Sequence, residues 1–539
     1  MLSPRSEIPT ERRRLPLVDG LAVIVLIASI AFFAAYVVDF GTVPYEDAAI
    51  LMRYAQHFAD GHGIVWNVGE TPVDGATDFL YMIVVGLLVK AGLSLEHSSR
   101  SVGIVSHVLL VLVVYQTLRA RLNASPLVGL LSSLYLATGP GLFLAAAYFG
   151  TPLFALFAAV TWSLALSLIQ EQPTHARAFW FAASSLTLGL IRPEGVILSG
   201  LMLVSVLYLQ PKGLRSRTLW HYLGVFSLAG GAYFLWRWHY FGYPLPNPFY
   251  KKGGGHLYPD SLRASLRNVV ALGLPFLPAF IFGFYSRHTS RRAVAFLIPI
   301  AGFALSFVLL SDEMNFGRRF QYALLPIIAL SWWPLLQGIR ADVTLPSWEH
   351  LDRRKRATLL VGASAIAVAL AAYQSTITRP GSARDGRYDV AIALRRYSGR
   401  SFTIAASEAG LLPLYSTWRA IDTWGLNDQW IAHTGTITPE YLERSRPEVI
   451  MFHSFPLVAA PWRGSNWGSM VATLKKYAEE NGYVLAAAYG LQPEDVFYYY
   501  VRSDFPESRD IIESIRGVDY YYLGGKAVNY ASSVCFLAR

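Results

Sequence analysis

The sequence has little cysteine and little charge, and both shortages narrow the class of protein. It has 539 residues and one cysteine, Cys535, which excludes a scaffold held together by disulfides within the chain. Charged residues make up only 15% of the chain, whereas a soluble globular protein carries about 25%. Because hydrophobic residues reach 53%, the composition also excludes a disordered chain and a soluble enzyme with a conventional polar surface.

Long apolar runs recur from Leu17 to about Tyr373 and predict a polytopic α-helical membrane protein. A transmembrane helix needs about 20 mostly apolar residues. We expect about eleven such helices, near residues 17–39, 101–118, 124–143, 153–170, 177–191, 195–209, 219–240, 267–285, 291–311, 320–337 and 357–374. The first run is about 23 residues long and no small-residue cleavage site follows it, so we expect a retained signal-anchor.

The basic residues indicate the topology. The apolar segment 79–89 is only about 11 residues long, a length typical of re-entrant or interfacial segments. If it does not span and the N-terminus is cytoplasmic, most basic clusters fall inside, as in membrane proteins generally. These clusters are Arg119/Arg121, His175/Arg177, Lys212/Arg215/Arg217, Arg287/Arg291/Arg292 and Arg340/Arg353/Arg354/Lys355/Arg356. The net charge of +10 is thereby explained without nucleic-acid binding.

The chain changes character after Thr376. We therefore divide it into a transmembrane domain, residues 1–376, and an extracytoplasmic domain, residues 377–539. The second domain contains strand-like runs (SFTIAA, PEVIMFH, YVLAAAYG and VFYYYVR) and a helical piece near residues 470–480. Alternating apolar residues and turn residues predict a small α/β or α+β fold.

The first outer loop, residues 41–79, begins with the acidic pair Glu46-Asp47 directly after the first span. Ile50, Leu51 and Tyr54 then follow at helical spacing, which predicts a helix along the membrane surface. Acidic groups beside hydrocarbon are costly and usually need a reason. One reason is catalysis; the alternative is that Asp47 serves only as the N-cap of this helix.

The loop and several later segments resemble GT-C membrane glycosyltransferases that use polyprenyl-phosphate sugars, and among these the arabinofuranosyltransferase-like proteins. The matching segments are EDA at 46–48, RYA at 53–55, GHG at 61–63, WNVGE at 66–70, DGATDFL at 74–80, RPEG at 192–195, YFGYPLPNPFYKK at 240–252, GRRF at 317–320 and DTWGLND at 422–428. The sequence departs from the family at Glu46, where the family has aspartate, and at Gly150, where it has glutamate. These departures leave the sugar open.

The resemblance implies a GT-C-like fold and assigns roles to residues. Glu46 or Asp47 would be catalytic, with the general base expected at Glu46, although which of the two is the base stays open. The donor phosphate would be bound by cations outside the inner basic clusters, namely Arg192, Lys251, Lys252, Arg318 and Arg319. The alternative for these cations is contact with lipid headgroups.

Further residues of the matching segments are candidates for binding the substrates. They are His62, Trp66, Asp74, Asp78, Glu194, Tyr240, Asn247, Tyr250, Asn427 and Asp428. Ordinary alternatives are an interfacial aromatic belt for the rings and a simple turn for the 422–428 segment. No group of residues has firm metal-ligand spacing, so no metal site and no cofactor are predicted, and a divalent cation is left open.

The function expected is transfer of a sugar, arabinofuranose as the best guess, to a cell-envelope glycan on the outer face of a bacterial inner membrane. The expected partners are a decaprenyl- or undecaprenyl-phosphate sugar, the glycan acceptor and the lipid bilayer. A transporter or flippase of lipid-linked sugars is the alternative. It predicts inverted repeats and charges near mid-membrane, and neither is evident in the sequence. A third hypothesis is an assembly subunit that binds sugar without turnover.

Overall fold

The structure is a computed structural model. It describes residues 17–171, 173–210, 213–252, 257–312, 314–342, 384–455 and 464–532, with scattered positions between 352 and 374. The predicted span 357–374, the predicted domain boundary at 376/377 and Cys535 therefore lie wholly or largely outside the described residues.

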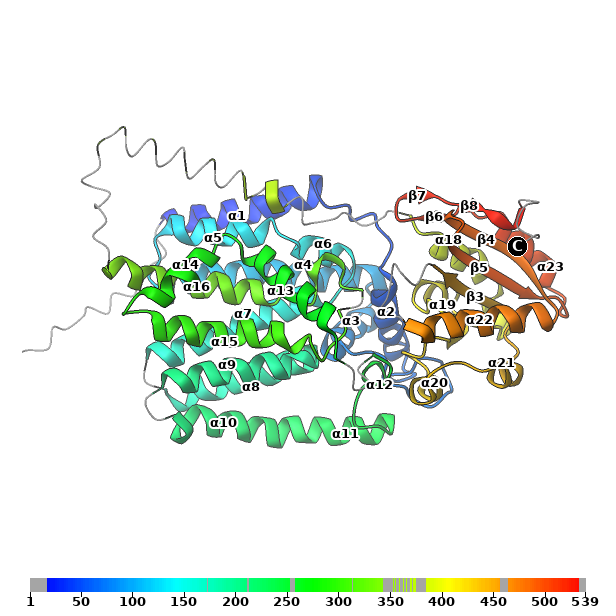
Figure 1. The fold of residues 1–539 in the computed structure, drawn as a ribbon, viewed down its shortest axis with the longest axis horizontal. Coiled ribbons are helices and arrows are strands. Elements are labelled where there is room, and N and C mark those ends of the chain that lie inside the picture. The colour runs from blue at the N-terminus through cyan, green and yellow to red at the C-terminus, as the bar shows by residue number, and fades with distance from the viewer. Residues whose placement is uncertain are drawn as a thin grey trace, which may run out of the picture.

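The N-terminal part is a bundle of helices that run roughly side by side along the long axis of the molecule (Figure 1). Its helices are α1 (Leu17–Tyr36), α2 (Glu46–Ala59), α3 (Phe79–Lys90), α4 (Leu95–Gln116), α5 (Pro126–Ala137), α6 (Gly141–Ala146), α7 (Thr151–Gln170), α8 (His175–Ile191), α9 (Glu194–Leu209), α10 (Arg217–Val225), α11 (Gly231–Phe241), α12 (Asn247–Lys252), α13 (Pro259–Gly273), α14 (Leu277–Tyr285), α15 (Ser290–Ser306) and α16 (Leu324–Asp342). Short π- or 3-10 segments extend or link them at η1 (Thr117–Arg121), η2 (Gly213–Arg215), η3 (Phe226–Gly230) and η4 (Phe316–Arg318).

The bundle helices follow the predicted spans closely. Among the described residues, four helical stretches are long and apolar enough to cross a membrane, or five if a bent pair counts as one span. They begin at Leu17, Leu95, Pro126 and Thr151. Other predicted spans form shorter apolar helices, such as α9 with 16 residues. The polytopic helical fold is confirmed, while the number eleven stays a prediction.

One predicted span has a different shape. Residues 267–285 do not form a straight helix, because α13 and α14 meet at an angle of 96°. Pro275 and Pro278 lie at the break. Proline lacks a backbone N–H and its ring clashes with the preceding turn, so two prolines three residues apart end one helix and begin another.

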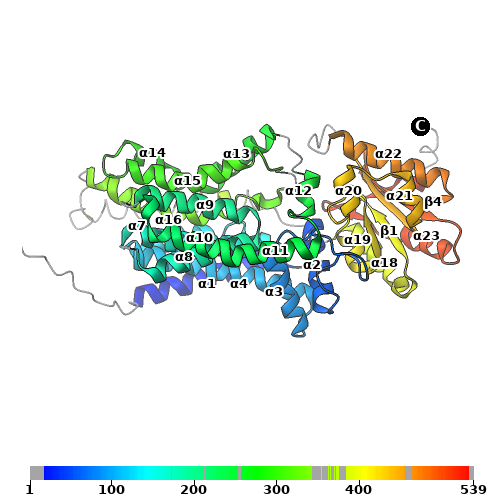
Figure 2. The same ribbon diagram turned by 90° about the horizontal axis from the view of Figure 1, so that it is seen from below.

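The first outer loop lies at the end of the bundle that adjoins the C-terminal domain (Figures 1 and 2). It contains the predicted surface helix as α2, with Ile50, Leu51 and Tyr54 buried. The apolar segment 79–89 becomes α3, a helix of 12 residues. This length is short of the roughly 20 residues that a span needs.

The C-terminal domain is a mixed six-stranded sheet with helices on both faces. Its strands have the order β2-β1-β3-β5-β4-β8, with β1 parallel to β2 and β3 and the other pairs antiparallel. The strands are β1 (Thr403–Ala406), β2 (Arg419–Asp422), β3 (Val449–Ser454), β4 (Tyr483–Gln492), β5 (Asp495–Arg502) and β8 (Val528–Asn529), with β6 (Tyr521–Tyr522) and β7 (Gly525–Lys526) as a separate pair. The helices are α18 (Gly386–Leu394), α19 (Leu411–Ser416), α20 (Gln429–Thr434), α21 (Pro439–Ser445), α22 (Gly464–Glu480) and α23 (Ser508–Arg516). The expectation of a sheet-containing second domain is confirmed.

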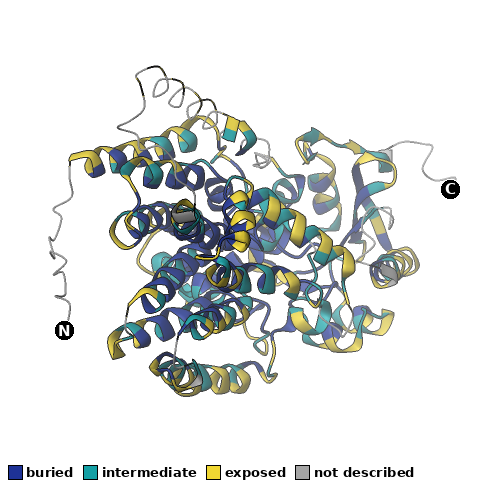
Figure 3. Cartoon of the chain, turned by 60° about the vertical axis from the view of Figure 1, so that its left-hand side comes forward, coloured by how far each residue is buried: buried dark blue, intermediate teal, exposed yellow. Residues whose placement is uncertain are grey.

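The two faces of this sheet belong to different cores, because side chains alternate along a strand. Phe452 and Tyr500 pack with Trp467 of α22 on one face. Met451 and Tyr499 point to the other face. That second face is continuous with the core of the helical bundle, so the C-terminal domain packs firmly on the bundle end. Buried residues accordingly run through the junction between the two parts (Figure 3).

Candidate active site

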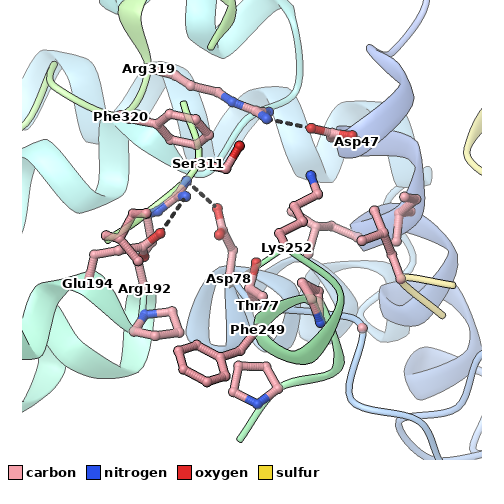
Figure 4. Close-up of a pocket in the computed structure, with 18 of the residues that line it drawn as sticks. Asp47, Thr77, Asp78, Arg192, Glu194, Phe249, Lys252, Ser311, Arg319 and Phe320 are labelled. Atoms are coloured by element: carbon pink, nitrogen blue, oxygen red, sulfur yellow. Dashed lines mark hydrogen bonds and ion pairs between the residues drawn. The ribbon is translucent and has the colours of Figure 1, made fainter. Parts of the chain in front are cut away.

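A cavity of about 440 Å³ opens where the bundle end, the first outer loop and the C-terminal domain meet. Its charged lining consists of Asp47, Asp78, Glu194, Arg192, Lys252 and Arg319 (Figure 4). Apolar walls come from residues such as Phe149, Phe249 and Phe320, and Leu426 is the contribution of the C-terminal domain. The cavity therefore combines three acids and three cations in a mainly apolar enclosure, where charges interact more strongly than in water.

Asp47 faces Arg319 across one side of the cavity. The two form an ion pair, and Lys252 points toward the same carboxylate (Figure 4). Burial by itself would raise the pKa of Asp47, but Arg319 and Lys252 outweigh it and hold this pKa below its usual value. The N-cap of α2 is Tyr45, and no side chain caps the helix. The interpretation of Asp47 as an N-cap is therefore wrong.

Arg192 occupies the opposite side of the cavity between two carboxylates. Its guanidinium lies 3.4 Å from Asp78 and 3.5 Å from Glu194. Burial raises the pKa of Asp78 even though Arg192 opposes the shift. Gly150 makes this arrangement possible, since a Cβ there would lie 3.0 Å from Asp78 Oδ2 and 2.8 Å from Tyr81 Cγ.

Glu46, the residue expected as the base, does not line this cavity. Its carboxylate turns into the C-terminal domain, where it accepts hydrogen bonds from the backbone N–H groups of Gly410 and Leu411. Arg387 lies 3.4 Å from the same carboxylate. Burial raises the pKa of Glu46 to about 7, although Arg387 opposes the shift.

Two of the predicted phosphate-binding cations also lie outside the cavity lining. Lys251 packs against the ring of Trp424 and donates a hydrogen bond to the Gly435 carbonyl. Arg318 ends η4 in a left-handed conformation with φ of 60°. In both basic pairs, therefore, the second residue lines the cavity and the first does not. The pairs are Lys251-Lys252 and Arg318-Arg319.

Most of the remaining candidates for substrate binding make contacts within the protein. Trp66 donates to the Ala420 carbonyl, and Asn247 donates to the carbonyls of Gly425, Leu426 and Asp428. Their contacts tie the first loop and α12 to the C-terminal domain.

The other residues predicted to bind substrate also make contacts within the protein or lie on its surface. Asp428 caps α20, and Tyr250 packs on His433. Asn427 donates to Asp422, while Tyr240 accepts a hydrogen bond from the Ile64 N–H. Asp74 pairs with Arg237, and His62 is exposed on the surface.

Several residues at the site are not among the candidates from the sequence. Thr77, within the matching segment 74–80, and Ser311, at the end of a predicted span, line the cavity as uncharged residues. Arg387, Asp385 and Glu408 come from the C-terminal domain and gather around Glu46. Neither an apolar run nor a recognisable motif marks Arg387, Asp385 or Glu408. Within the described residues, no group of three or more His, Cys, Asp or Glu side chains is placed to hold a metal ion.

Comparison with solved structures places this architecture in a known class. The structure is similar to ArnT from Cupriavidus metallidurans in the apo state, with a TM-score of 0.55 and 13% identity, over 89% of this chain and 98% of that chain. It is also similar to the same protein bound to undecaprenyl phosphate, with a TM-score of 0.53 and 13% identity over 90% and 97% of the two chains.

The Archaeoglobus fulgidus oligosaccharyltransferase, in complex with Zn and sulfate, is a third similar structure. Its TM-score is 0.50 and its identity 14%, over 91% of this chain and 74% of that chain. At such identities the similarity shows the fold, and this is the GT-C fold. Residues 374–504 match a domain of unknown function, DUF8728. No curated protein matches the sequence.

Proposed function

We propose that this protein is a membrane glycosyltransferase that moves a sugar from a polyprenyl-phosphate donor to a glycan acceptor. The observation that carries the proposal is the convergence of the Asp47 carboxylate and three cations, Arg192, Lys252 and Arg319, on one cavity. The similarity to ArnT, solved with undecaprenyl phosphate, supports a donor of this kind. The reaction takes place at the end of the bundle that adjoins the C-terminal domain, outside the cytoplasm of a bacterial cell.

Asp47 is the general base of this reaction. The acceptor hydroxyl gives its proton to Asp47 while its oxygen forms a bond to the anomeric carbon of the sugar. The bond between that carbon and the phosphate oxygen breaks, and the electron pair leaves with polyprenyl phosphate. Arg319 keeps Asp47 ionised, so that the base is present at neutral pH.

The leaving phosphate is stabilised by the cations. Arginine matches a phosphate with a planar fork of N–H donors, and lysine acts as a point charge. Both kinds of side chain face the cavity here. Asp78 and Glu194 then lie where they accept hydrogen bonds from sugar hydroxyls, and Gly150 leaves the room for Asp78. Arabinofuranose stays our best candidate for the sugar, and a cell-envelope glycan for the acceptor.

An apolar cavity beside the charged one is the binding site that we assign to the polyprenyl chain of the donor. A second cavity of about 370 Å³ shares Thr77 and Pro193 with the first and lies among α3, α8, η3 and α11. Apart from Asp74, Thr77, Tyr233 and Arg237, its lining is apolar or glycine. Apolar surface of this kind favours a hydrocarbon chain.

The test is turnover of decaprenyl-phosphate arabinofuranose by the purified full chain carrying Asp47→Asn. The amide keeps the shape of the side chain and removes its basicity, so the rate should fall by about 10²–10⁴-fold. Asp60→Asn is the matched control, because Asp60 lies at the other end of the same helix and bonds only Gln56 through its carboxylate among the described contacts. Near-normal turnover by the folded Asp47→Asn chain would remove the acid from the mechanism.

A further inference from the structure

The carboxylate of Glu46 is held by the C-terminal domain. It accepts hydrogen bonds from Gly410 N–H and Leu411 N–H, the second at 3.3 Å. The fit is tight, since a Cβ on Gly410 would lie 2.1 Å from the Glu46 carbonyl oxygen and 2.9 Å from its Oε1. Only glycine lets the two backbones approach this closely.

Arg387 is the second group of the C-terminal domain that contacts the Glu46 carboxylate. It also links Glu46 to a larger network of charged side chains. Its guanidinium lies 3.4 Å from Glu46, 3.5 Å from Glu408 and 2.6 Å from Asp385. Glu408 in turn lies 3.4 Å from His453 Nδ1. The side chains of Arg387, Glu46 and Glu408 are all at least four-fifths buried, with exposed fractions of 11%, 14% and 8%.

Helix α2 packs on α3 of the bundle, and it also contacts the C-terminal domain beyond Glu46. Arg53 donates to the carbonyls of Pro413 and Trp418 from within α2. Asn67, further along the loop, exchanges hydrogen bonds with the backbone of Ala420 in both directions. No side chain caps the start of α2. At this end Tyr45 packs on Phe143 and Phe149 of the bundle, and the Glu46 carboxylate contacts the C-terminal domain.

Glu46 and Asp47 are the first two residues of α2, so fixing one fixes the other. Successive side chains on a helix point about 100° apart. With Glu46 turned into the C-terminal domain, Asp47 is turned toward Arg319 and the cavity. We propose that the C-terminal domain positions the catalytic loop, with Arg387 and the Gly410 and Leu411 amides as positioning groups that hold Glu46 and thereby orient Asp47. This inference rests on the proposed function and assigns a role to the domain that matches DUF8728.

The experiment compares Arg387→Met and Gly410→Ala in the purified full chain. The methionine removes the charge at similar length, and the new Cβ at position 410 pushes α2 without removing any functional group. Displacement of a reacting group by about 1 Å costs up to about 100-fold in rate, so kcat should fall by about 10- to 100-fold. Binding of undecaprenyl phosphate should be unchanged, because both variants keep the cavity cations Arg192, Lys252 and Arg319. Arg387→Lys should restore part of kcat, since it keeps the charge and loses the fork.

Matched controls come from the same domain. Gly399→Ala adds a Cβ with nothing within 4 Å. Arg396→Met removes a more exposed arginine, which pairs with Asp510. Both controls should behave as the wild type. A fall in kcat with unchanged affinity for undecaprenyl phosphate separates positioning from loss of folded protein.

Amide hydrogen exchange over residues 46–59 provides a readout that needs no donor sugar. Arg387→Met and Gly410→Ala should speed exchange at the start of α2 relative to both controls. Wild-type exchange together with wild-type kcat in these two variants would overturn the inference and leave the proposed function standing. If the wild-type chain neither bound undecaprenyl phosphate nor consumed the donor, the proposed function would fail, and the exchange experiment would still decide whether the domain holds α2.

Discussion

Adjacent residues of the same charge at this site have side chains that point in different directions. The sequence alone does not show which of the two faces the cavity. Glu46-Asp47, Lys251-Lys252 and Arg318-Arg319 are pairs of like residues. In each pair the second member lines the cavity and the first does not. The family resemblance identifies the pairs, but the direction of each side chain depends on helix phase and on contacts far away in the chain. The Glu46 side chain, for example, accepts a hydrogen bond from the N–H of Gly410, which lies 364 positions later in the chain.

The basic pairs allow a matched test of phosphate binding. Lys252→Ala and Arg319→Ala should each weaken binding of undecaprenyl phosphate, because a hydrogen bond to a charged group contributes about 1.5–3 kcal/mol, which is roughly 10- to 100-fold in affinity. Lys251→Ala and Arg318→Ala should leave that affinity nearly unchanged. Equilibrium binding to the purified chain measures all four. Equal losses within each pair would indicate a general electrostatic effect in place of direct contact.

Titration of Glu46 makes the stability of the folded chain depend on pH, and the direction of this dependence follows from the shift of its pKa. Burial raises its pKa from 4.5 to about 7 in the folded chain. The protonated Glu46 carboxyl is therefore favoured in the folded state relative to the unfolded state. Its contribution to the free energy of unfolding is fully present below about pH 4.5 and is lost as the pH rises through about 7. Glu46→Gln removes the titration. Thermal unfolding between pH 5 and 8 should show a shallower decline for the variant than for the wild type, and parallel declines would contradict the assignment.

At the scale of elements, the sequence predicts those whose apolar pattern is long. Helices α7 and α8 begin within two residues of the predicted spans at 153 and 177, and strands β3 and β5 overlap the predicted runs PEVIMFH and VFYYYVR. Periodicity gives no sign of the bend between α13 and α14, because the residues on both sides of it are apolar. The short helix α19, with six residues, is likewise unmarked. It packs against α18 and α2, and no local pattern in the sequence encodes these contacts.

The junction of α7 with α3 offers a test at this scale. Gly150→Ala would place a Cβ 2.8 Å from Tyr81 Cγ and 3.0 Å from Asp78 Oδ2. Overpacking of this kind typically costs about 1–3 kcal/mol, and here it also displaces Asp78 from Arg192. We expect a lower unfolding temperature and a higher KM for the sugar donor. Gly224→Ala in α10, where nothing lies within 4 Å, is the control. A KM that did not change in Gly150→Ala would argue against Asp78 as a sugar contact.

For the whole molecule, the sequence predicts two domains but not how the site depends on both. The bundle core and one face of the C-terminal sheet form a continuous apolar cluster. The charged network of Arg387 and Glu46 lies at the same junction. Such contacts join residues hundreds of positions apart, and a single sequence carries no pattern that pairs them. This is why the cavity cations could be named in advance and Arg387 could not.

The arrangement of the whole chain predicts its orientation in the membrane. The cavity and the C-terminal domain lie at one end of the bundle, and the turns that follow α7, α9 and α14 lie at the other (Figure 1). Basic residues in or beside these turns, such as Arg177 at the start of α8, Arg215 and Arg287, favour the cytoplasm. A phosphatase that folds only outside the cytoplasm should therefore be active when fused after Thr376, which lies outside the described residues, and inactive when fused after Glu171. Fusions of a reporter that works only inside should give the opposite pattern. Phosphatase activity after Glu171 and none after Thr376 would reverse the orientation and place the proposed transfer on the cytoplasmic face.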